Sequence, residues 1–151
     1  MKAVETNLLT LLKRNETQFI VPIYQRTYSW TLEQCKQLWA DIMRIAQGKP
    51  TDTHFVGSIV YIEQGHQTAT SVDKYLVIDG QQRLTTLSIL LAALGKAIET
   101  NPGQGSETSR QRIKNVYLTN PEEKDDLRHK LILTRSDRET CLLYTSDAAD
   151  E

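Results

Sequence analysis

Five polar or small residues between two apolar runs are the part of this chain best suited to chemistry. The stretch reads Tyr75-Leu-Val-Ile-Asp-Gly-Gln-Gln-Arg-Leu-Thr-Thr-Leu, so one apolar run stops at Asp79 and the next begins at Leu84. A strand that passes directly into a helix leaves the first backbone N–H groups of that helix free. These donors and the positive end of the helix dipole attract anions. The pattern therefore predicts an anion site of phosphate size at this junction.

The side chains of the junction have predicted roles at such a site. Gly80 permits a tight turn and a close ligand, and Arg83 can bind phosphate through two N–H groups. Asp79 can hold a divalent cation that bridges phosphate oxygens. The other polar side chains, suited to orienting water or to hydroxyl contacts, are Gln81, Gln82, Thr85 and Thr86. The alternative is structural, with Asp79 as a helix cap and Arg83 on the surface. The spacing of a Walker A loop is absent.

A second stretch, "VPIYQRTYSW" from Val21 to Trp30, combines an arginine with aromatic residues. In an extended conformation Arg26 and three rings point to one side, so the arginine can pair with phosphate while a ring stacks on a base. These rings belong to Tyr24, Tyr28 and Trp30. The alternative is that the rings cover the core and that Arg26 forms a structural ion pair. Gly57, inside a strand-like run, marks a place where a backbone or ligand comes close.

These residues must be positioned by helices and strands whose patterns follow the order α-β-α-β-β-α-α-β, which predicts an α+β fold. The pattern predicts a helix that begins at the N-cap Thr31, with Gln34 completing a capping box, and a long helix that is apolar almost all round and hence buried. The expected segments are helix 5–14, extended chain 18–30, a helix from 32 to Gly48, strands 54–63 and 74–79 as a hairpin, helix 81–99, a loop at 101–106, helix 107–118 and a strand at 129–134.

The composition is that of a single soluble domain. The chain has 151 residues, of which 39% are hydrophobic and 25% charged. No apolar run approaches the roughly 20 residues of a membrane span, and no secretory signal is apparent, so we expect a cytoplasmic protein without a membrane partner. The three histidines have no metal-ligand spacing. We therefore expect no zinc site.

The last eleven residues, 141–151, differ in character from the rest. "CLLYTSDAADE" resembles the translation of a transposase-type sequencing adapter. We therefore expect a domain over 1–140, a non-native tail over 141–151, and a natural protein that continues beyond Thr140. Without the tail's three acids, 18 basic residues face 16 acidic ones, a balance too mild to indicate nucleic acid. Only Cys35 then remains, so a disulfide framework is excluded.

Three segments in this order, "IVPIYQRTYSW", "HFVGSIVY" and "YLVIDGQQRLTTLSILLAAL", closely resemble the N-terminal domain of GmrSD-type restriction endonucleases. That family is related to the ParB/sulfiredoxin-like fold, a small sheet packed against helices. The resemblance implies a domain that binds and hydrolyses an NTP with Mg²⁺ in bacterial defence against phage, usually acting on modified foreign DNA. It also implies a C-terminal HNH-type nuclease domain or subunit. No histidine-asparagine-histidine constellation occurs in this chain, so DNA cleavage is not assigned to it.

The resemblance also assigns the candidate site. The nucleotide-site motif corresponds to the stretch from Asp79 to Arg83, and the second box corresponds to Gln25 with Arg26. The predicted catalytic residues are Asp79, Gln81, Gln82 and Arg83, with Asp79 also the metal ligand. The predicted nucleotide-binding residues are Tyr24, Gln25, Arg26, Gly57, Gly80 and Thr85. Two other functions remain open: a DNA-binding module without hydrolysis, and a protein-interaction scaffold.

Overall fold

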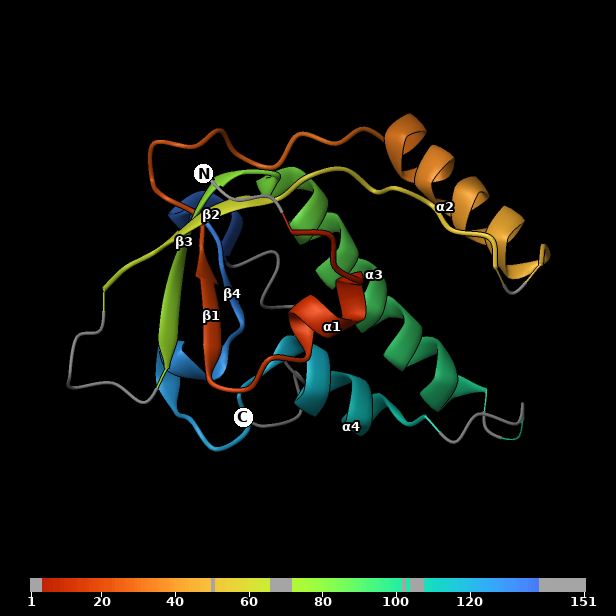
Figure 1. Cartoon of the computed structure of the whole chain (residues 1–151). Coiled ribbons are helices and arrows are strands. Elements are labelled where there is room, and N and C mark those ends of the chain that lie inside the picture. The colour runs from red at the N-terminus through yellow and green to blue at the C-terminus, as the bar shows by residue number, and fades with distance from the viewer. Residues whose placement is uncertain (1–3, 50, 66–71, 102, 104–107, 139–151) are drawn as a thin grey trace.

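The computed structural model describes residues 4–49, 51–65, 72–101, 103 and 108–138 (Figure 1). The predicted tail at 141–151 and most of the predicted loop at 101–106 lie outside the described residues. The elements are α1 (Leu8–Leu12), β1 (Thr17–Ile20), α2 (Leu32–Ala46), β2 (Val60–Glu63), β3 (Asp73–Asp79), α3 (Gln81–Thr100), α4 (Arg110–Ile113), a π-helix (Lys114–Leu118), a 3-10 helix (Asp125–Arg128) and β4 (Leu131–Ile132). Their order and the α+β class confirm the prediction.

The four strands form one mixed sheet in the order β2-β3-β1-β4. The central strand β1 runs parallel to both β3 and β4, with Phe19 opposite Tyr75 on one side and Leu131 on the other. β2 pairs antiparallel with β3, as predicted for the hairpin. In Figure 1 the helices α1, α3 and α4 lie on one side of this sheet. The carboxyl end of β3 therefore leads directly to the start of α3.

The core lies between the sheet and these helices. Phe19 and Val77 from the sheet pack against Leu84 of α3 and Leu12 of α1, and all four side chains are buried. The ring of Phe19 meets that of Tyr61 edge-on at a centroid distance of 5.4 Å. Burial of this apolar surface is the main favourable contribution to folding. Because Leu84 is one of its members, the core fixes the first turn of α3 relative to β3.

Three of the predicted extended segments are longer than the observed strands, and the one expected at 129–134 is reduced to Leu131–Ile132. The strand expected at 54–63 begins only at Val60, since Gly57 has a φ of 113° and the pairing with β3 is irregular between Val60 and Tyr61. The chain expected to be extended over 18–30 leaves the sheet after Ile20, and the Gln25 N–H donates to the Pro22 carbonyl in a turn. The alternating pattern predicted for the aromatic residues therefore does not hold beyond β1.

The predicted capping box is correct, but the predicted burial of the long helix 81–99 is only partly correct. The capping box of α2 is present, with the Thr31 N–H donating to the Gln34 side chain at 2.8 Å. However, only Leu38 of α2 is buried, and Trp39 is 54% exposed, because this helix projects away from the sheet (Figure 1). α3 is buried over its first two turns, whereas Leu94 in its second half is exposed.

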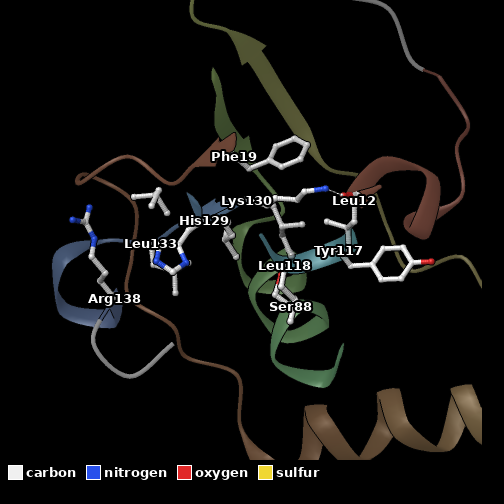
Figure 2. Close-up of a pocket in the computed structure, with 12 residues that line it drawn as sticks. Leu12, Phe19, Ser88, Tyr117, Leu118, His129, Lys130, Leu133 and Arg138 are labelled. Carbon is white, nitrogen blue, oxygen red and sulfur yellow. Dashed lines mark hydrogen bonds between the residues drawn. The ribbon is translucent and has the colours of Figure 1, made fainter. Parts of the chain in front are cut away.

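Lys130 is a buried lysine that joins three parts of the fold. Its side chain is only 4% exposed, and its ammonium group donates to the carbonyls of Leu12, Val116 and Arg14 at 2.7, 2.7 and 3.0 Å. It lies beside a cavity of about 20 Å³, and Figure 2 shows its side chain extended toward Leu12. All three donors of a protonated lysine are thus used. The sequence pattern gave no sign of this residue's role.

Replacing Lys130 tests its structural role. Lys130→Met keeps an apolar stem but leaves three carbonyls without their donor, so we expect urea denaturation to show a loss of about 3 kcal/mol in the free energy of unfolding. Lys36→Met, on the exposed surface of α2, is the control and should change that free energy by less than about 0.5 kcal/mol. Equal losses in both variants would contradict the assigned role.

The same variant has an expected pH dependence. Burial lowers the pKa of Lys130 from 10.5 to about 8, so the folded chain releases this proton at lower pH than the unfolded chain does. Unfolding between these pH values takes up a proton, and the contribution of Lys130 to the free energy of unfolding therefore rises with pH. The difference in stability between the parent chain and Lys130→Met should widen from pH 8 upward.

Candidate functional site

A polar pocket of about 430 Å³ lies at the N-terminal end of α3. It brings together the two stretches that the sequence pattern singled out, in which the hydrogen-bonded Gln25 and Gln81 are 56 positions apart. Its lining residues are Gln25, Arg26, Trp30, Asp79, Gly80, Gln81, Gln82 and Arg83. Every one except Trp30 belongs to the predicted site. The pocket falls within the size range of about 300–1,000 Å³ typical of small-molecule sites.

The junction between β3 and α3 has the geometry that an anion site needs. Gly80 is the N-cap of α3, with a φ of 91°, and it offers no side chain to cap the helix. The first helical hydrogen bond runs from the Leu84 N–H to the Gly80 carbonyl at 3.0 Å. The preceding N–H groups are therefore not capped by a side chain. The structural alternative, in which Asp79 caps the helix, is wrong.

Arg83 is held at the pocket by the segment before β2. Its Nη2 donates to the Ser58 carbonyl at 2.5 Å, and it also lies 3.8 Å from a carboxylate oxygen of Asp79. Its Nε is buried and has no acceptor among the described residues. A Cβ atom at Gly57 would lie 3.0 Å from that Nε. Gly57 is thus closely approached, but by the side chain of Arg83 and not by the predicted backbone or ligand, and Gly57 is not among the lining residues.

Gly80 permits a second close approach at the same place. A Cβ atom there would lie 2.8 Å from the Ser58 carbonyl oxygen and 3.1 Å from the Cα of Ile59. The first distance is shorter than real Cβ contacts, and the second is tighter than most of them, so a side chain here would force a shift. The segment from Gly57 to Ile59 can thus pack directly on the junction, and it carries the carbonyl that orients Arg83.

Gln82 joins the two halves of the pocket. Its side chain is buried, its Nε2 donates to the Thr27 carbonyl at 3.0 Å, and its Oε1 accepts the Ser29 N–H at 2.8 Å. The carboxamide is thus engaged at both ends with the backbone of the loop that carries Arg26 and Trp30. The geometry gives Gln82 a positioning role.

Gln81 and Gln25 form a second connection between the stretches. The Nε2 of Gln81 donates to Oε1 of Gln25 at 3.2 Å, and the Nε2 of Gln25 donates to the Ile78 carbonyl at 3.1 Å. Arg26, the next residue, is exposed and lines the pocket. Within the described part of the chain it makes no hydrogen bond or ion pair, so its guanidinium group is available to a ligand.

Asp79 is the acidic residue of the pocket. Its side chain is 65% exposed and its described charged partner is Arg83. No group of three or more potential metal-ligating side chains is present among the described residues. Mg²⁺ in nucleotide sites is commonly held by one or two carboxylates together with phosphate oxygens and water. Among the residues that line the pocket, Asp79 is the one carboxylate that could contribute such a ligand.

Other predicted site residues lie apart from the pocket. The hydroxyl groups of Thr85 and Thr86 are buried and donate to the carbonyls of Gln81 and Gln82, both at 2.8 Å. Tyr24 is 72% exposed and is not among the lining residues. The hydroxyl of Thr85 is thus buried against the backbone of its own helix, and Tyr24 lies on the surface outside the pocket.

The sequence reasoning also missed contributors to the site. Asp137 accepts the Tyr28 N–H at 2.8 Å, and the Tyr28 hydroxyl is bonded to that of Thr86 at 2.9 Å. Asp137 and the carbonyl of Ser58 therefore support the site from segments with no apparent motif. The only signal in the sequence was Gly57, which precedes Ser58.

Comparison of the sequence with protein-family models finds a matching family. The family model described as GmrSD restriction endonuclease, N-terminal domain, matches residues 8–150. No match was found among curated proteins. Within the described residues, no helix has the length and apolar character needed to cross a membrane.

Gln82→Met tests the connection between the two halves of the pocket. The change removes two hydrogen bonds and leaves the Thr27 carbonyl and the Ser29 N–H without their partner. We expect faster amide hydrogen exchange at Ser29 and a loss of about 2 kcal/mol in the free energy of unfolding. The control is Gln37→Met on exposed α2, which should change neither quantity. Unaltered exchange at Ser29 in Gln82→Met would rule out this role.

Gly80→Ala tests the close packing at the junction. A Cβ atom at φ 91° and 2.8 Å from the Ser58 carbonyl forces the backbone to move, so we expect a loss of about 2 kcal/mol in stability by chemical denaturation. The control is Gly65→Ala, because a Cβ atom at Gly65 meets nothing within 4 Å. Similar stability of the two variants would show that the junction is not tightly packed.

Proposed function

This chain belongs to the family of GmrSD restriction endonuclease N-terminal domains, and from that premise we propose that it binds and hydrolyses a nucleoside triphosphate. Such a domain would regulate a bacterial restriction system that acts on modified foreign DNA. The observation that carries the proposal is the pocket at the start of α3. It combines two arginines, an exposed carboxylate and a helix N-terminus that no side chain caps.

The phosphate-binding part of the proposal rests on charge and geometry. Arg83 is oriented by the Ser58 carbonyl, and Arg26 has no other described partner, so both guanidinium groups can pair with phosphate oxygens. The uncapped N–H groups of α3 add donors, and its dipole favours negative charge. Together these groups offset part of the negative charge of a triphosphate.

The proposed hydrolysis needs few further groups, since phosphoryl transfer depends mainly on positioning and on neutralised charge. Asp79 would bind the Mg²⁺ that arrives with the nucleotide. Of the two glutamines, Gln81 is the better candidate to orient the attacking water, because only its Nε2 has a described partner. Gln82 would hold the loop, since both ends of its amide are occupied.

The partners in this proposal follow from the family. DNA would be engaged through the intact protein, and cleavage would be performed by an HNH-type nuclease, either a C-terminal domain or a separate subunit. The system would act in the bacterial cytoplasm. In this arrangement the described domain contributes nucleotide-dependent control.

The proposal predicts the effect of removing each charged group. Arg26→Ala and Arg83→Ala should each weaken binding of a Mg²⁺–NTP complex about tenfold or more, because each removes a charge-assisted contact to phosphate. Asp79→Ala should reduce phosphate release more than it reduces binding. Calorimetry measures binding, and a phosphate-release assay measures turnover.

The control is Arg44→Ala, on the exposed surface of α2, which should leave both binding and turnover unchanged. Unchanged turnover in both Asp79→Ala and Arg83→Ala would exclude the assignment. Binding of DNA that weakens steeply with salt and does not respond to nucleotide would instead favour a DNA-binding module.

A further inference from the structure

We propose that the indole ring of Trp30 stacks on the base of the bound nucleotide. The pocket would then select a complete nucleoside triphosphate over a bare polyphosphate. This inference rests on the proposed function and deepens it, because it assigns the part of the ligand that the arginines do not bind. Within the described part of the chain, Trp30 is the aromatic member of the residues that line the pocket.

The structure separates Trp30 from the other aromatic residues of its stretch. Tyr24 is exposed and lies outside the pocket lining. The hydroxyl of Tyr28 is bonded to that of Thr86, which holds this ring against α3. Of the three rings that the sequence offered for stacking, only Trp30 is therefore at the pocket.

Trp30 also has no described interaction that would explain its place. It is half-buried, and among the described residues its indole makes no hydrogen bond and no contact with another ring. A large aromatic surface that lines a polar pocket without such partners is well suited to stacking. Every nucleobase has a face that can stack on an aromatic side chain.

The loop that carries Trp30 is fixed relative to the phosphate-binding residues. The side chain of Gln82 forms hydrogen bonds with the backbone of Thr27 and Ser29, and Trp30 is the next residue in the chain. A volume of about 430 Å³ leaves room for a base and sugar beside the phosphates. The base would therefore lie against Trp30, and the phosphates between Arg26 and the start of α3.

Tryptophan fluorescence gives a direct test, because the chain has only two tryptophans. Trp39 lies on α2 outside the pocket, so Trp39→Phe leaves Trp30 as the single reporter. This variant is titrated with ATP, GTP, CTP, UTP and tripolyphosphate, each with Mg²⁺. We expect at least one nucleotide to quench the fluorescence, and tripolyphosphate to compete with it without quenching.

The matched variants separate the base from the phosphates. Trp30→Ala should weaken binding of the quenching nucleotide about tenfold, the size expected from loss of one base–aromatic stack, and should leave tripolyphosphate affinity unchanged. Trp30→Phe should retain most of the affinity, since phenylalanine can still stack. Trp39→Ala is the control and should alter neither affinity.

The outcomes distinguish this inference from the proposed function. If nucleotides and tripolyphosphate bind equally well, without quenching and without an effect of Trp30→Ala, stacking is overturned and the phosphate site stands. If neither ligand binds, both proposals fail. If Trp30→Ala does not fold, quenching in Trp39→Phe decides the question without that variant.

Discussion

The pocket depends on the two hydrogen bonds that the side chain of Gln82 makes with the loop before α2. One wall comes from the turn between β3 and α3, and the other comes from a loop that precedes α2. Gln82 is buried and bonds that loop through both its oxygen and its nitrogen. A buried amide with both ends satisfied is favourable, whereas the same amide without the loop would leave polar groups unpaired. These hydrogen bonds therefore fix the position of the loop that carries Arg26 and Trp30 relative to α3.

Gly57 and Gly80, two of the glycines with positive φ, also help to build the pocket. Gly80 lets the backbone of Ser58 and Ile59 reach the junction, and Gly57 leaves space for Arg83. The Ser58 carbonyl then orients the guanidinium group. An arginine side chain loses considerable rotational entropy when it is fixed. Because the scaffold has already fixed Arg83, a ligand that binds it does not incur that loss again.

The sequence predicted the residues that line the pocket better than it predicted their surroundings, for physical reasons. A strand that runs into a helix through Asp79-Gly80 is a local pattern, and five of the eight lining residues belong to it. Arg83 donates to the carbonyl of Ser58, and Lys130 donates to the carbonyl of Leu12. These backbone acceptors lie far away in the chain, and no residue type in the sequence indicates such a bond. The helix 81–99 is expected to be buried along its length, but Leu94 is exposed, because helical periodicity shows an apolar face but not what covers it.

The two walls of the pocket differ in how they are held, and this difference bears on what each can do. The α3 wall is anchored by the core, since Leu84 and Leu87 are buried within its first two turns. The loop wall is anchored chiefly by hydrogen bonds, from Gln82 and Asp137 to its backbone and from Thr86 to Tyr28. Packed cores resist deformation more than hydrogen-bonded loops do. In the proposed nucleotide complex, α3 would thus hold the invariant phosphates, whereas the loop would contact both the phosphates through Arg26 and the variable base through Trp30.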